Sequence, residues 1–131
     1  MRPEDLKFST DHEWVKKEGK RATIGITDFA QESLGDIVFI ETPETNIELS
    51  AEEEIMEIES TKTTSPVLAP ISGKIIEVNQ ELKERPELIN EDPYGLGWIA
   101  VIEMSDPSEL DNLMDYKEYE EFIREEQQEE D

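Results

Sequence analysis

Residues 55–73, IMEIESTKTTSPVLAPISG, contain the pattern that decides the fold class. Apolar Met56 and Ile58 alternate with acidic neighbours, which is typical of a strand buried on one face. Polar residues 60–64 then form a turn signal, and a second apolar run follows before the next turn. The stretch therefore predicts a β-hairpin with Lys62 at its exposed tip.

Outward from this hairpin, short β-type runs separated by turn signals fill most of the chain. A helix is expected to begin near Thr27 and to stop at Gly35, because glycine adopts the left-handed backbone of a helix end at little cost. Many short strands favour a mostly β fold with two packed sheets, a β-sandwich. The strands are predicted at residues 13–17, 21–26, 37–41, 47–58, 74–78 and 98–104. The strand at 37–41 is expected to be buried, and Ile76 and Val78 are expected on one face of the strand at 74–78.

The C-terminal region has helical patterning instead. Asp106 is suited to cap a helix whose first residue is Pro107, and apolar residues recur at helical spacing from Leu110 to Ile123. Two short helices, or one broken helix, should pack on the sheets. Residues 1–131 are predicted to form one domain, with residues 125–131 as a frayed acidic tail.

The chain has 131 residues and a formal net charge of -23, with 35 acidic and 12 basic residues. A surface with this much negative charge repels phosphate backbones and anionic membranes. Binding to nucleic acids or membranes is therefore not expected. No cysteine, no signal-peptide core and no membrane-length apolar run are present in the sequence. A cytoplasmic protein is expected.

Residues suited to catalysis are scarce. His12 is the single histidine, and Gly95 and Gly97 lack the third glycine of a phosphate-binding loop. One histidine without cysteine cannot build a usual zinc site, so no metal site is expected. His12, beside Trp14, is predicted to be structural, and no catalytic residue is assigned.

Lys62 remains the distinctive residue. Most lysines at turns only increase solubility. An amine exposed at a hairpin tip can also be bound and acylated by another protein. The residues around it favour the second interpretation. Together they resemble the glycine cleavage H-protein family, whose lipoyl attachment hairpin has a similar core and whose other segments match in order. The matching segments are residues 12–15, 25–31 with 34–36, 55–62, 69–79, 90–95 with 97–98, and 109–110 with 113–114 before Tyr119.

The resemblance implies a lipoyl/biotinyl-type β-sandwich, or barrel-sandwich hybrid, with short N-terminal and C-terminal helices. It further implies a non-catalytic carrier with lipoate joined as an amide to Lys62. Glu59, Ser60 and Thr61 would be the hairpin recognition residues, and Glu13 would line a cleft for the arm. The implied partners are a pyridoxal-phosphate glycine decarboxylase, an aminomethyltransferase and dihydrolipoyl dehydrogenase, with a lipoate ligase or lipoyl synthase for attachment.

The sequence departs from the family pattern at four positions. Thr61 replaces a usual valine, and Asn46 and Glu52 stand where glycines are usual; glutamate does not readily adopt the left-handed backbone of a glycine turn. Pro66 replaces an acid that helps to line the cleft. Loss of that acid removes a charge-assisted hydrogen bond to a cationic cargo.

The Pro66 departure leaves a second carrier role open, namely an H-like lipoate-binding protein that carries sulfur intermediates for a heterodisulfide-reductase-like complex. An unmodified binding module and an enzyme acting alone are the other classes of function considered. Retention of Lys62 and Glu59 disfavours the unmodified module.

Overall fold

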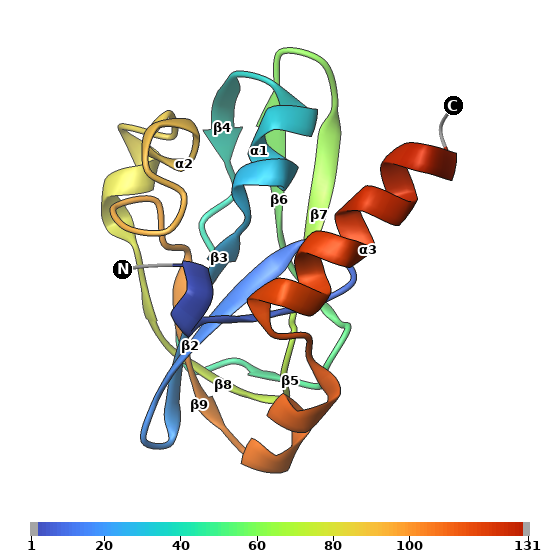
Figure 1. Ribbon diagram of the computed structural model, residues 1–131. Coiled ribbons are helices and arrows are strands. Elements are labelled where there is room, and N and C mark those ends of the chain that lie inside the picture. The colour runs from blue at the N-terminus through green and yellow to red at the C-terminus, as the bar shows by residue number, and fades with distance from the viewer. Residues whose placement is uncertain (1–2, 130–131) are drawn as a thin grey trace.

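The computed structural model describes residues 3–129, which form two antiparallel sheets (Figure 1). The larger sheet has the strand order β1-β2-β3-β9-β8-β5, and the smaller has the order β4-β6-β7. The prediction of a mostly β, sandwich-like fold with C-terminal helices is confirmed. The strands are β1 (Lys7–Phe8), β2 (Glu13–Glu18), β3 (Arg21–Ile26), β4 (Ile37–Ile40), β5 (Glu48–Leu49), β6 (Glu54–Ser60), β7 (Thr64–Leu68), β8 (Gly73–Val78) and β9 (Ala100–Met104).

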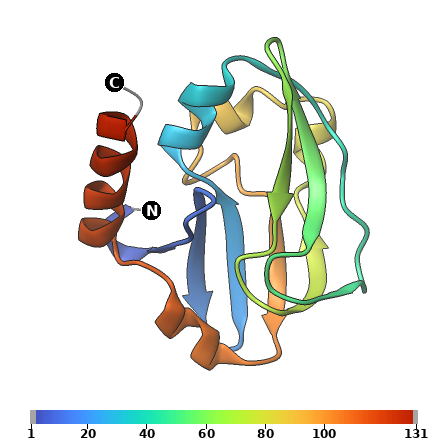
Figure 2. The same ribbon diagram turned by 90° about the vertical axis from the view of Figure 1, so that its right-hand side faces the viewer.

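Helical segments surround the sheets. Figure 2 shows α1 at the same end of the molecule as the β6–β7 hairpin, whereas α3 lies on the side of the N-terminal strands. Among the described residues, no helix is long and apolar enough to span a membrane. The α-helices are α1 (Asp28–Leu34), α2 (Leu88–Glu91) and α3 (Tyr116–Glu129), and the 3-10 helices are η1 (Pro3–Asp5), η2 (Gln80–Lys83) and η3 (Pro107–Asn112).

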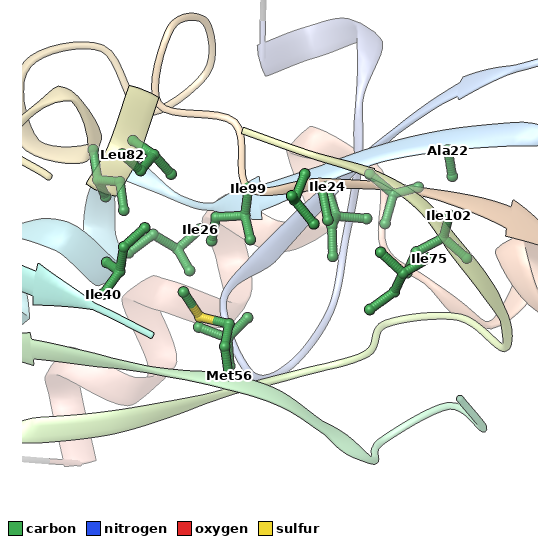
Figure 3. Packing of buried hydrophobic residues seen from close by; sticks show 14 of the residues in the cluster. Ala22, Ile24, Ile26, Ile40, Met56, Ile75, Leu82, Ile99 and Ile102 are labelled. Atoms are coloured by element: carbon green, nitrogen blue, oxygen red, sulfur yellow. The ribbon is translucent and has the colours of Figure 1, made fainter. Parts of the chain in front are cut away.

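The main core lies between the two sheets (Figure 3). Met56 of β6 reaches from the small sheet toward Ile26 and Ile99, which come from the large sheet and the segment before β9. All three side chains are at most 4% exposed. A second apolar cluster, built from Phe8, Trp14 and Tyr119 among others, attaches α3 to the first strands. Burial of this apolar surface drives the assembly of sheets and helices.

Helix α1 begins and ends where the sequence predicts. The Thr27 hydroxyl accepts a hydrogen bond from the Ala30 amide at 3.2 Å, which caps the helix N-terminus. Gly35 at the C-terminus has φ +83°, a left-handed conformation that favours glycine. The chain therefore leaves α1 along a fixed path into β4.

Three strand predictions need correction. The predicted strand at residues 47–58 is two strands, β5 and β6, separated by a turn in which Glu52 has φ 76°. Asn46 has φ 64°, so both residues keep the left-handed backbone that glycine usually supplies, and Glu52 does so at a cost of about 1 kcal/mol. In β8 a register shift between Ile75 and Glu77 buries Ile75, so Ile76 does not share the inward face of Val78.

The strand predicted at residues 37–41 is not buried throughout. Ile37 and Ile40 are in the core, but Val38 and Phe39 are 51% and 57% exposed. A register shift between Ile37 and Phe39 accounts for two consecutive exposed residues.

The connection between β8 and β9 contains η2 and α2, which the sequence did not predict because each is only four residues long. Leu82 and Leu88 anchor these helices in the core, each 1% exposed. The Trp14 indole nitrogen donates a hydrogen bond to the Pro93 carbonyl at 2.9 Å. This connection is therefore a packed part of the fold rather than a loose loop.

At the C-terminus the Asp106 carboxylate accepts a hydrogen bond from the Ser108 amide at 3.1 Å, as a cap should, although the helix that follows is 3-10. Helix α3 continues through residues 125–129, where the sequence suggested a frayed tail. A contact between Glu126 and His12 holds this part of the helix. Residues 130–131 lie outside the described residues.

Candidate functional site

The β6–β7 hairpin has a short loop that is held by Ser60. The Ser60 amide donates to the Thr63 carbonyl at 2.8 Å, and the Ser60 hydroxyl oxygen accepts from the amides of Lys62 and Thr63, each at 3.1 Å. Ser60 is only 7% exposed. A serine side chain that satisfies local amides stabilises a tight turn. The backbone on both sides of Lys62 is therefore fixed from within the hairpin.

The segment between α1 and β4 supports the same loop from outside. The Thr61 amide donates to the Asp36 carbonyl at 2.9 Å. A Cβ at Gly35 would lie 3.3 Å from Lys62 Cε and 3.5 Å from its Cδ, so the lysine stem passes over the bare glycine backbone. Gly35 thus both ends α1 and leaves room for the Lys62 side chain.

Asn90 of α2 holds this supporting segment in place. Its amide nitrogen donates to the Gly35 carbonyl and to Gln31 Oε1, both at 2.9 Å, and its Oδ1 accepts from the Ile37 amide at 2.9 Å. Asn90 therefore fixes both neighbours of Asp36, which in turn binds Thr61. Asn90 lies in a segment that matches the family, but the sequence carries no signal of this role, because the contacts join residues far apart in the chain.

Lys62 itself is exposed. Among residues 3–129, its Nζ has no hydrogen-bond or ion-pair partner, although Glu59 stands three residues away on the outward face of β6. A lysine amine that is neither paired nor buried is accessible to an acylating enzyme. The arrangement can therefore present a covalently attached group.

A cleft of about 520 Å³ opens beside the hairpin, between α1, β7 and α3. It reaches Leu34, next to the Gly35 backbone that carries the Lys62 stem. Phe29 and Val67 contribute apolar surface, and Pro66 lies on the β7 wall. Carboxylates enter the cleft from Glu32 and Glu126. Neither residue stands out in the sequence, since acidic residues are frequent throughout the chain.

Glu13 does not line this cleft but lines a separate hollow beside Ser9. It is 2% exposed; its carboxylate accepts from the Ser9 hydroxyl at 2.7 Å and from the Leu68 amide at 3.3 Å. Burial raises the pKa of Glu13 to about 7, although both hydrogen bonds act to lower it. The structure thus brings Glu13 to β7 but not to the lining of the cleft that contains Pro66.

His12 is tied to α3 and α1. Its Nδ1 lies 2.8 Å from the Tyr119 hydroxyl, and its Nε2 lies 3.0 Å from Glu126 Oε2. The Tyr119 hydroxyl is also 2.6 Å from Thr27 Oγ1. Both imidazole nitrogens therefore have protein partners, which agrees with the interpretation of His12 as structural.

Comparisons with known proteins identify the family to which the chain belongs. The sequence profile of the family described as "Glycine cleavage H-protein" matches residues 6–126. Glycine cleavage system H proteins of Geobacillus sp. (strain WCH70) and Bacillus subtilis (strain 168) are 52% and 51% identical over 123 residues, covering 94% of this chain and 97% of each relative. The crystal structure of a glycine cleavage system H protein from Mycobacterium marinum has a TM-score of 0.82 and 40% identity, covering 90% of this chain and 95% of that one.

The fold and the presented lysine define a carrier domain rather than a catalyst. This chain belongs to the glycine cleavage H-protein family. That family consists of lipoate-carrying subunits, so the prediction of a non-enzymatic carrier subunit is confirmed.

Proposed function

We propose that Lys62 carries lipoate as an amide on Nζ, and that the chain shuttles an aminomethyl group between the components of a glycine cleavage system. The observation that carries this proposal is the Lys62 hairpin, whose backbone is bound by Ser60 and Asp36 while the amine is exposed. Membership of the H-protein family supports it.

The residues around Lys62 fit an extended group at that position. When bound, lipoate supplies a dithiolane that performs redox and group-carrying chemistry. Gly35 leaves space for the start of the arm, and the cleft from Leu34 to Pro66 offers apolar contacts from Phe29 and Val67 beside its carboxylates. Ser60 and Asp36 orient the attachment point through its backbone, so the protein contributes presentation and shelter.

Carboxylates of the cleft support an aminomethyl cargo. Pro66 removes one acid from the β7 wall, but Glu32 and Glu126 line the same cleft from α1 and α3. A cationic amine in this cleft can therefore still find a carboxylate partner. The expected partners are a pyridoxal-phosphate glycine decarboxylase, an aminomethyltransferase and dihydrolipoyl dehydrogenase, with attachment by a lipoate ligase or lipoyl synthase in the cytoplasm.

The Lys62→Arg variant tests the attachment site. Arginine keeps the charge and the stem but cannot form the amide, so we expect complete loss of lipoylation with a far-UV circular dichroism spectrum and melting temperature like those of the wild type. Intact mass after incubation with lipoate ligase, lipoate and ATP measures this, with the mass increase mapped by peptide digestion. Lys74→Arg is the matched control, because Lys74 is half-buried in β8 and away from the hairpin. A mass increase that persists in Lys62→Arg contradicts the proposal.

Reconstitution tests the cargo. The lipoylated chain, mixed with glycine decarboxylase, should support exchange between glycine and bicarbonate, and the unlipoylated chain should not. A lipoylated chain that fails in this assay argues against aminomethyl transfer and favours the sulfur-carrying alternative.

A further inference from the structure

Two consecutive apolar side chains, Val38 and Phe39, are exposed on β4. A regular strand alternates between faces, so one of the two should point inward. The register shift between Ile37 and Phe39 changes this alternation, and both side chains face solvent while Ile37 and Ile40 stay buried. A β-bulge changes the direction in which side chains point, and such bulges are frequent at sheet edges and next to functional sites.

Carboxylates surround this apolar pair. Phe39 pairs with Glu59 across the β4–β6 ladder, so their side chains share the outward face. The Glu41 amide donates a hydrogen bond to the Glu57 carbonyl at 3.1 Å. Glu57 therefore lies two residues further along β6 from Glu59, and its side chain is also exposed. Asp36 is exposed at the start of β4. An apolar centre with a charged rim is the usual anatomy of a protein–protein interface.

This surface, consisting of Asp36, Val38, Phe39, Glu57 and Glu59, is joined rigidly to the Lys62 loop. Ile37 pairs with Ser60, and the Asp36 carbonyl binds the Thr61 amide at 2.9 Å. Pro66 and Val67 of the cleft wall come from β7, which is the edge strand of the small sheet opposite β4. A partner on the β4 side can thus hold the hairpin without covering the cleft.

We propose that this surface is the docking site for the enzyme that acylates Lys62, and that the enzyme meets it with an apolar groove rimmed by lysine and arginine. The inference rests on the lipoyl attachment proposed above. In the reaction, the neutral amine of Lys62 Nζ attacks the carbonyl carbon of an activated lipoyl group, such as the lipoyl adenylate, a mixed anhydride whose leaving group is AMP. The new C–N bond replaces the bond to the leaving group, which departs with its electron pair, and the amine loses a proton.

The position of the reacting atom selects this partner over the later ones. Acylation takes place at Nζ itself, so the enzyme must approach the residues next to Lys62. Partners that act after attachment react at the far end of an arm longer than the lysine stem, and they can dock at a greater distance. The carboxylates favour a basic rim, because complementary charge increases the rate of encounter.

The Val38→Ser/Phe39→Ser variant tests the surface in the full-length chain. With purified lipoate ligase, lipoate and ATP, we expect kcat/KM for lipoylation to fall about tenfold, as for loss of an apolar anchor at an interface. Ile47→Ser is the matched control, since Ile47 is a 42% exposed apolar residue beside β5, at the opposite end from the hairpin. Its kcat/KM should equal that of the wild type.

Glu57→Gln tests the charged rim without touching the hairpin loop. We expect a decrease of about threefold at low salt that disappears at high ionic strength. A decrease that is independent of salt contradicts the basic rim.

The outcomes separate the docking inference from the function on which it rests. If the wild type gains no lipoyl mass at Lys62, the proposed function fails. If the wild type is lipoylated and the double variant, folded by circular dichroism, reacts at the same rate, the docking surface is wrong. Val38→Thr keeps the β-branched shape; should the double variant unfold, an unchanged rate for Val38→Thr overturns the inference. An unchanged ligase rate with slower glycine decarboxylase turnover would assign the surface to a later partner instead.

Discussion

The Lys62 hairpin and the corner around His12 are each built on one polar side chain, but they hold it in opposite ways. At the hairpin, the hydrogen bonds from Ser60 and Asp36 fall on the backbone, and the amine is left exposed. At the corner, both imidazole nitrogens of His12 contact side chains of α3. Contacts on the backbone position a reactive group and leave it available, whereas contacts on the side chain turn a polar group into a structural link.

Tyr119→Ala gives the largest change in stability and should leave the hairpin intact. The Tyr119 ring is 1% exposed, stacks on Phe8 with centroids 4.6 Å apart, and its hydroxyl contacts His12 and Thr27. Its truncation should lower the free energy of unfolding by about 3–5 kcal/mol. Chemical denaturation measures this, and lipoylation kinetics of the folded fraction should not change. A large effect on lipoylation would mean that the two regions are not separate.

Asn90→Leu should affect both stability and the site, because Asn90 supports the hairpin from a distance. Loss of its hydrogen bonds leaves the Gly35 carbonyl and Ile37 amide without that partner, and should cost about 2–4 kcal/mol. Hydrogen exchange of the Thr61 amide should become faster than in the matched control Asn79→Leu. Asn79 is an 8% exposed asparagine that bonds the Leu96 and Trp98 carbonyls, away from the hairpin. Equal exchange in both variants contradicts a positioning role.

Glu13→Gln tests the buried carboxyl that contacts β7. Because burial raises its pKa from 4.5 to about 7, the folded chain retains a proton that the unfolded chain has lost between these pH values. The Glu13 contribution to the free energy of unfolding should therefore decrease as pH rises from 4.5 to 7, by on the order of 2 kcal/mol. Denaturation at a series of pH values should show this slope in the difference between the wild type and Glu13→Gln. A constant difference would contradict the raised pKa.

Glu126→Ala should have the smallest effect. The Glu126 side chain is 34% exposed, and its contact with His12 is a single 3.0 Å pair. Partly exposed pairs contribute little, so we expect a loss below about 1 kcal/mol. Thermal unfolding measures the loss, with Glu125→Ala, an exposed neighbour on the same helix, as the control. A larger loss would show that the C-terminal turns of α3 depend on His12.

The sequence predicted the elements whose signals are local. The limits of α1 followed from Thr27 and Gly35, and the hairpin around Lys62 followed from alternation and polar turn residues. Helices η2 and α2 were missed because four residues contain too little periodicity. The exposure of Phe39 was missed because a bulge depends on pairing with β6, which local sequence does not specify.

The residues of the candidate site show the same difference between local and long-range signals. Lys62 and Ser60 lie within one short stretch, where both local pattern and family resemblance apply. Asn90, Glu32 and Glu126 reach the site from other elements, and only the folded chain brings them together. Long-range contacts of this kind have no local sequence signature.

The hydrogen bond between the Thr61 amide and the Asp36 carbonyl also limits the volume that a group attached to Lys62 would explore. With the loop fixed, a group on Lys62 explores only the volume that its own bonds allow, and loop motion adds nothing to it. Its effective concentration at a docked partner is then set by arm length alone. A looser loop would dilute the same group over a larger volume and slow each transfer without weakening any contact between the proteins.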